Sequence, residues 1–168
     1  SIAGSVSPGG PVAPPELGPW TLPASATFRA TDNDINLANN QSLTLAPGQY
    51  GELNFASNTT LTLTAGTYAF KSLFSDSIFN ELNLDTSGGE IVIQIEEDAF
   101  LGLQTLVDGA ELAETDTANA SKVLLETAGS ISMAGSFYGT VFAPHGTIEL
   151  GENYLLIGSA IAGNDIRG

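Results

Sequence analysis

The amino-acid sequence predicts an all-β solenoid, in which short strands stack in successive coils of the chain. Three observations predict it: a repeat at a spacing of eighteen residues, alternation of apolar and polar residues, and glycine-containing turns. Between Ser42 and Phe70, Leu43, Leu45, Gly48 and Tyr50 recur as Leu61, Leu63, Gly66 and Tyr68. A strand and a corner that recur at a fixed period near twenty residues are typical of a solenoid.

Alternation within each repeat predicts strands with one buried face. In Leu43-Thr44-Leu45 and in Leu61-Thr62-Leu63, the leucines occupy every second position, so they point inward and the threonines point outward. The turns after these strands contain Gly48 and Gly66, and glycine tolerates the backbone angles that a corner needs. Each turn is followed by a tyrosine that begins the next strand.

The remainder of the chain continues the pattern with less regular spacing. Leu82-Asn83-Leu84 follows Leu61-Thr62-Leu63 after twenty-one residues, and Ile131–Met133 is echoed by Ile148–Leu150. The segment 139–146 is echoed by 158–165, nineteen residues later. Such spacings fit a coil with roughly three short faces, in which each coil buries its apolar side chains against the next.

Two segments depart from this pattern and define the expected organisation. Residues 1–27 contain most of the eight prolines, which donate no ladder hydrogen bond, so this segment is expected to be an extended N-terminal arm. Residues 28–168 form the expected solenoid domain. Within it, residues 102–121 are expected to be an insertion, either a loop or a short helix with Leu103, Leu106 and Ala110 on one face.

Composition excludes several classes of partner. Four Lys and Arg residues stand against nineteen Asp and Glu, for a net charge of −15, so phosphate backbones and anionic lipids are disfavoured as partners. There is no cysteine for a disulfide or a thiolate metal site, and no apolar run reaches the length of a membrane span. Because the chain begins with Ser1, we expect a processed N-terminus from which a signal peptide has been removed.

The repeated motifs resemble those of a known group of proteins. The segment LAPGQYGELNFASNTTLTLTAGTYAF (residues 45–70) and the segment containing FYGTVFAP (137–144) are similar to motifs of secreted bacterial surface domains, including choice-of-anchor domains. The ice-binding domain family is a more distant resemblance. The likeness covers about residues 36–166 and implies a right-handed parallel β-helix displayed outside the cell. It implies no catalytic residues, because the shared motifs are turns and core positions. Ice-binding relatives carry a long helix along the solenoid, which only the short, acidic segment 102–121 could supply here.

Candidate catalytic residues are sparse, and we expect no enzymatic activity. His145 is the one histidine and lies in a Pro-His-Gly turn, where a solvated role is expected. A polysaccharide-cleaving β-helix would need basic residues beside its carboxylates to stabilise developing charge, and the four basic residues are scattered. A pair of carboxylates for glycoside hydrolysis is not set in a pattern that indicates a cleft.

The acidic residues leave one candidate metal site. Asp32, Asp34 and Asn36 alternate oxygen ligands in a way that suits Ca²⁺, although the glycine and the distant glutamate of a full calcium loop are absent. The alternative is a solvated acidic turn. Apart from this Ca²⁺ hypothesis, we expect no cofactor.

A second candidate surface is the polar face of the strands around residues 58–64. Thr60, Thr62 and Thr64 would present a rank of hydroxyls for ice or a glycan, but Asn83 and Asp85 are expected to break this rank in the next coil. An exposed row of threonines is also simply a favourable β surface.

The expected ends of the solenoid favour self-assembly. The last coil lacks a capping helix and carries little charge, and an uncapped solenoid end exposes unpaired strand edges. An arm that reaches a neighbouring copy would give a head-to-tail contact, which propagates into a filament or surface layer. The leading hypothesis is therefore an extracellular structural protein whose partner is itself; the alternative is a monomeric surface-binding module. The expected assembly interface comprises Val12, Leu17, Trp20, Leu22, Tyr154, Leu155, Ile157 and Ile161.

Overall fold

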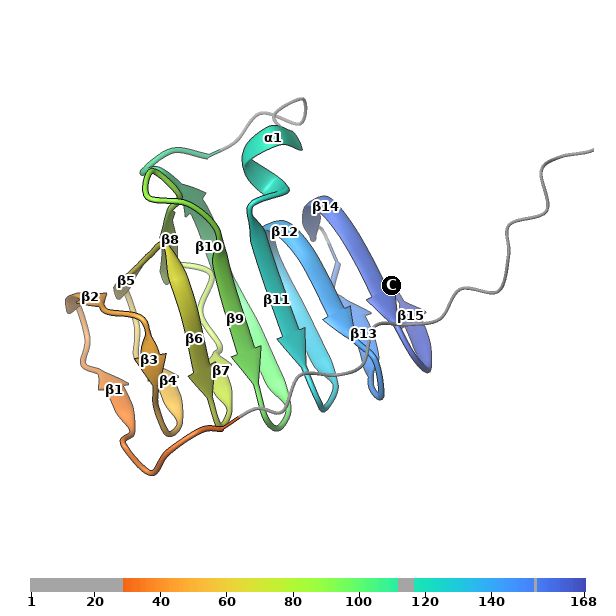
Figure 1. The fold of residues 1–168 in the computed structure, drawn as a ribbon, viewed down its shortest axis with the longest axis horizontal. Helices are drawn as coiled ribbons and strands as arrows, with labels where there is room; N and C mark the ends of the chain where they lie inside the picture. The colour runs from red at the N-terminus through yellow and green to blue at the C-terminus, as the bar shows by residue number, and fades with distance from the viewer. Residues whose placement is uncertain (1–28, 112–116, 153) are drawn as a thin grey trace, which may run out of the picture.

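The computed structural model describes residues 29–111, 117–152 and 154–168, which form a single curled sheet of fifteen strands (Figure 1). All pairings between these strands are parallel, and successive strands along the chain lie in different parts of the sheet. The predicted all-β class and the parallel stacking of repeats are therefore confirmed. The predicted arm at residues 1–27 lies outside the described residues.

The strands of the curled sheet fall into three rows, and each strand pairs with its neighbours in the same row. Row A contains β1 (Ile35–Leu37), β4 (Leu53–Phe55), β7 (Leu73–Ser75), the first part of β10 (Ala99–Val107), the first part of β12 (Ile131–Ala143), β13 (Thr147–Leu150) and β15 (Asp165–Arg167). Row B contains β2 (Ser42–Leu45), β5 (Thr60–Thr64), β8 (Glu81–Asp85) and the second part of β10. Row C contains β3 (Gly48–Gln49), β6 (Gly66–Phe70), β9 (Ile91–Ile95), β11 (Val123–Thr127), the second part of β12 and β14 (Leu155–Ala162).

The pairing register confirms the repeats found in the sequence. Leu43 pairs with Leu61, and Leu61 pairs with Leu82, so the leucines stack in one column. In the C-terminal part, Gly139 pairs with Gly158 at the predicted spacing of nineteen residues. Alternating inward side chains fill the interior, and the largest fully buried ones are Tyr68, Phe70, Phe137, Leu53, Leu61, Leu63, Leu82, Leu84, Ile91, Ile93, Ile95 and Leu103.

The expected equivalence of the two tyrosines is wrong. In row C, Gly48 rather than Tyr50 pairs with Tyr68, so the spacing changes from eighteen residues in row B to twenty in row C. Tyr50 instead stacks on Phe70, with 5.6 Å between the ring centroids. The corner between rows B and C is two residues longer in the second coil: Gly48 comes three residues after Leu45, whereas its partner Tyr68 comes five residues after Leu63. Within this longer corner Gly66 has a φ of 139°, and a Cβ at this position would collide with the ring of Pro47.

Asparagine side chains connect successive coils at the corner between rows A and B. Asn40 and Asn58 both have a φ of 59°, a conformation that asparagine tolerates better than most residues. Their side chains are hydrogen-bonded, with Asn58 Nδ2 donating to Asn40 Oδ1 at 2.7 Å. One coil later, the buried Asn80 accepts hydrogen bonds from the backbone N–H and the hydroxyl of Thr59.

The helical alternative for residues 102–121 is wrong for its first part. Leu103 and Leu106 belong to β10, where extended pairing with β12 and β8 replaces the helix that their spacing also allowed. The described helix, α1, covers only Thr117–Ala120 and contacts β12 and β14. None of the described helices is long and apolar enough to cross a membrane.

The last strand of row B is β10. Backbone groups on its outer edge form hydrogen bonds with nearby residues instead of with another strand of the row. Val107 both donates to and accepts from Ala110, which forms a tight antiparallel bridge. The backbone N–H of Thr105 donates to Ser136 Oγ at 3.3 Å. The next coil then passes from row A to row C at Gly135, whose φ is 105°. The C-terminal coils therefore have two rows, whereas the N-terminal coils have three.

Candidate functional site

Two of the three candidate calcium ligands accept hydrogen bonds that join the first two coils. Asp34 Oδ1 accepts a hydrogen bond from the backbone N–H of Glu52 at 2.9 Å, and Asn36 Oδ1 accepts one from Asn54 Nδ2 at 3.1 Å. Asp32 is exposed. Within the described ranges, no three or more His, Asp or Glu side chains form a group that could hold a metal ion. A calcium site at Asp32, Asp34 and Asn36 stays a prediction.

His145 is exposed, in a turn between the buried residues Pro144 and Gly146. The backbone N–H of Gly146 donates to the carbonyl of Ala143 at 3.2 Å, and the His145 carbonyl accepts from Asn164 Nδ2 at 2.9 Å. The backbone of His145 therefore joins two coils, and its imidazole lies on the surface.

The polar face of row B has the predicted composition and the predicted interruption. Thr62 pairs with Thr44 on one side and with Asn83 on the other. At the neighbouring position Thr60 pairs with Ser42 and Glu81, and its hydroxyl lies 3.2 Å from Glu81 Oε2. The row of outward hydroxyl side chains therefore extends over two coils. In the third coil, acidic and amide side chains occupy the same positions.

Row A presents an aromatic pair that the sequence reasoning missed. Phe74 and Phe100 pair across β7 and β10, and their rings are offset-stacked with centroids 5.6 Å apart. They are 48% and 36% exposed, and they line a groove of about 340 Å³ together with Ser72, Asp98, Ser130 and Ser132. The available signal was a phenylalanine at two outward strand positions where alternation predicts a polar residue.

The predicted C-terminal interface divides into a buried and an exposed part. Ile157 is buried, and Tyr154 is half-buried with its hydroxyl 3.3 Å from Met133 Sδ; burial raises the pKa of Tyr154 well above its ordinary value. Leu155 and Ile161 are 40% and 41% exposed. Ile166 of β15, which the sequence reasoning missed, is 47% exposed. The predicted residues Val12, Leu17, Trp20 and Leu22 lie outside the described residues.

The strand β14, which carries Leu155 and Ile161, is also an edge strand of the sheet. Within the described part of the chain, β14 pairs only with β12, and β15 pairs only with β13. The N–H of Gly163 donates to the Ala143 carbonyl, and backbone groups of alternate residues face alternate neighbours in a parallel ladder. Leu156, Gly158, Ala160 and Ala162 therefore direct their N–H and C=O groups away from β12. This edge can accept another strand.

Comparison with known proteins leaves the family of the chain unassigned. No family model matches the sequence, and no curated protein or solved structure matches it significantly.

Proposed function

We propose that the curled sheet is a right-handed β-helix and that the protein is a non-enzymatic structural subunit displayed outside the cell. In this proposal subunits stack head to tail into a filament or surface layer. The resemblance to secreted bacterial surface domains supports the location and the handedness. The net charge of −15 suits a surface that repels neighbouring filaments or attracts cations.

The observation that carries the proposal is the edge of β14. Four residues there direct eight backbone groups away from the sheet, and soluble proteins usually blunt such an edge with charge, proline or a covering segment. The row B edge of this same molecule is blunted, by the bridge between Val107 and Ala110 and by Ser136. The contrast between the two edges favours an assembly role for β14.

The backbone hydrogen bonds along this edge would only balance the free-energy cost of association, so side chains must also contribute to the junction. Eight backbone hydrogen bonds at about 0.5–1.5 kcal/mol each contribute roughly 4–12 kcal/mol. The loss of rotational and translational freedom on association costs about 4–15 kcal/mol. Burial of the exposed Leu155 and Ile166, and an arm that crosses the junction with Val12 and Leu17, would supply the difference.

Sedimentation velocity of the full chain tests this proposal. We expect large polymers for the unmodified protein and a much smaller species for Leu155→Lys, because a charge would be buried in the junction. Phe100→Lys is the matched control, because Phe100 is similarly exposed but lies on row A away from the β14 edge. Monomers for the unmodified protein across the accessible concentration range would refute the proposal.

A second candidate function is a monomeric module that binds a surface polysaccharide at the groove beside Phe74 and Phe100. Exposed aromatic rings stack against the apolar faces of sugars, and the flanking serine hydroxyls and Asp98 offer hydrogen bonds to sugar hydroxyls. Pull-down with insoluble polysaccharides would support it if binding is lost in Phe74→Ala and kept in Thr62→Ala. The opposite result would favour the threonine face of row B.

A further inference from the structure

The groove on row A lies between two columns of outward side chains that differ in chemistry. Phe74 and Phe100 form one wall, with their rings stacked across β7 and β10. Ser72 and Asp98, each two residues earlier in the chain, belong to the opposite wall. The residues between the two columns are buried, so the strand backbone forms the floor. A groove with one apolar wall and one polar wall fits a sugar ring, which has apolar faces and a polar rim.

The Asp98 carboxylate is held in place and has one oxygen available. Its Oδ1 accepts a hydrogen bond from the backbone N–H of Ser130 at 2.7 Å, and a Cβ at Gly129 would collide with this oxygen. Within the described part of the chain, its Oδ2 accepts no hydrogen bond and the carboxylate has no ion-pair partner. A fixed carboxylate with a free oxygen is preorganised for a donor on a ligand, and its hydrogen bond to a cationic donor is the strongest kind.

The charges around this groove favour a cationic ligand. Among the described residues no basic side chain lines it, although Lys71 precedes Ser72 in the chain. The exposed Asp76 and Glu97 lie within two residues of lining residues and add negative charge. The faces of the phenylalanine rings attract cations as well, and the net charge of −15 acts in the same direction at longer range.

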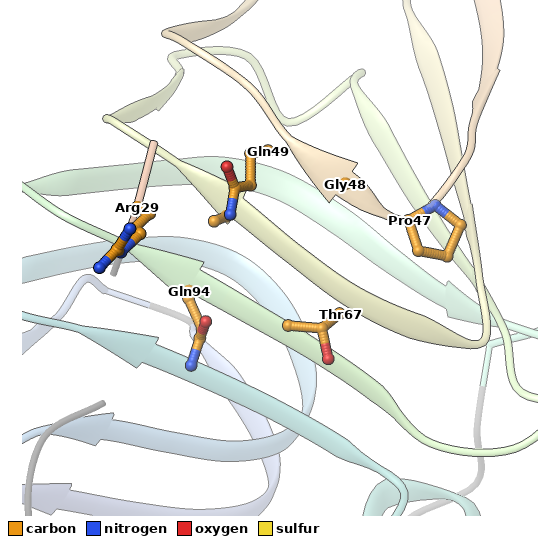
Figure 2. A pocket seen from close by; sticks show the side chains of 7 residues that line it. Arg29, Pro47, Gly48, Gln49, Thr67 and Gln94 are labelled. Carbon is orange, nitrogen blue, oxygen red and sulfur yellow. The ribbon is translucent and has the colours of Figure 1, made fainter. Parts of the chain in front are cut away.

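A groove on row C has a different character, although its volume of about 470 Å³ is larger. Figure 2 shows Arg29 beside Gln49 and Gln94, which project from β3 and β9. The described residues that line this groove include no carboxylate and no aromatic ring. A cation would meet the guanidinium of Arg29 there. Of these two grooves, only the one on row A combines aromatic rings with a carboxylate.

We propose that the groove on row A binds a polysaccharide of cationic amino sugars, whose chain runs across β7 and β10. This inference rests on the polysaccharide-binding function given above as the second candidate, and it names the class of sugar. The apolar face of a sugar stacks on Phe74 and Phe100, its ammonium group donates to Asp98 Oδ2, and the Ser72 hydroxyl bonds to a sugar hydroxyl. Polymers of uronic acids are repelled by the same carboxylate, and neutral sugars lack the charge-assisted hydrogen bond.

Asp34 provides a matched control within the same protein. Its Oδ1 accepts a hydrogen bond from the backbone N–H of Glu52 at 2.9 Å, and a Cβ at Gly51 would collide with this oxygen. Asp34 immediately precedes β1 and Asp98 immediately precedes β10, so the two aspartates occupy equivalent corners of row A. The column beside Asp34 contains Asn36 where the groove has a phenylalanine. Asp34→Asn therefore removes the same charge as Asp98→Asn without changing the aromatic groove.

Calorimetric titration of the protein with a β-1,4-linked glucosamine hexamer, at a pH at which the amines are protonated, tests the proposal. The N-acetylated hexamer has the same backbone and no charge, so we expect it to bind about tenfold more weakly. Asp98→Asn should weaken binding of the glucosamine hexamer by about tenfold and leave the N-acetylated hexamer unaffected, whereas Asp34→Asn should alter neither. A lysine hexamer should bind more weakly than the glucosamine hexamer, because it has no sugar face to stack on the rings.

Equal affinity for the two sugar hexamers, or equal effects of the two aspartate variants, would overturn the choice of an amino sugar and leave the polysaccharide-binding function intact. A lysine hexamer that binds as tightly as the glucosamine hexamer would indicate a site for a cationic peptide and would also overturn the proposal. Binding of neither sugar hexamer would overturn it too, and the pull-down with insoluble polysaccharides then decides whether the broader function fails with it. The groove does not require assembly, so the result is independent of the filament.

Discussion

Removal of the Tyr68 hydroxyl is expected to destabilise the protein by about 2 kcal/mol. Tyr68 is fully buried, and its hydroxyl accepts from the backbone N–H of Thr64 at 2.9 Å. It also lies 3.0 Å from the Leu45 carbonyl and 2.9 Å from the Thr64 carbonyl, to one of which it donates. In Tyr68→Phe the ring still fills the core, but a buried N–H loses its partner, at a cost of about 1–3 kcal/mol.

The matched control is Tyr50→Phe. The Tyr50 hydroxyl donates to the Ala46 carbonyl at 2.6 Å, but Ala46 is exposed, so water replaces the lost partner and the expected cost is about 0.5 kcal/mol. Thermal unfolding followed by circular dichroism measures both. A domain of this size loses about 2–4 °C in Tm per kcal/mol, so we expect a decrease of about 4–8 °C for Tyr68→Phe and about 1–2 °C for Tyr50→Phe. Equal decreases would refute the reasoning.

Three further changes test the turns and buried polar groups. Gly66→Ala should destabilise the fold by about 2 kcal/mol or more in urea unfolding, because its φ is 139° and the new methyl group meets Pro47; wild-type stability would contradict the turn assignment. Asn80→Ala should cost about 2–3 kcal/mol, because its buried amide satisfies groups from two coils; a loss below about 0.5 kcal/mol would show that water takes its place. Hydrogen bonds from the hydroxyl and the backbone N–H of Ser87 hold the pKa of Asp85 below its ordinary value. Its stabilising contribution is therefore present above a pH of about 4 and is lost as the pH falls through the lowered pKa. In an NMR titration, Ser87→Ala should raise this pKa, and an unchanged value would contradict the assignment.

Much of the fold was predictable from local pattern. Alternation placed Leu43, Leu61 and Leu82 in one inward column, because a period of two fixes which side of a strand is buried. The column then required parallel stacking of the repeats. The interruption of the threonine rank at Asn83 and Asp85 followed from the same register.

The errors arose where the register depends on contacts distant in sequence. The shift between Tyr50 and Tyr68 arises because the corner between rows B and C is two residues longer in the second coil than in the first, and the repeated motif does not reveal this difference. Leu103 and Leu106 fit both a helix face and a strand, and pairing with β8 and β12 decides for the strand.

Among candidate sites, the exposed pair Phe74 and Phe100 was missed because their spacing of twenty-six residues departs from the shorter repeats. Tyr154 and Ile157 were predicted to lie in an assembly interface, but Ile157 is buried within the subunit and Tyr154 is half-buried, because sequence alone does not distinguish a buried apolar position from an exposed one.

Electron microscopy of the unmodified protein beside the variant Ala160→Pro tests the central claim most directly. The backbone N–H of Ala160 faces away from β12, so proline at this edge position removes a donor from the junction without removing a hydrogen bond within the subunit. The account predicts filaments for the unmodified protein and separate, folded particles for Ala160→Pro. Separate particles in both samples, or identical filaments in both, would contradict assembly through the β14 edge.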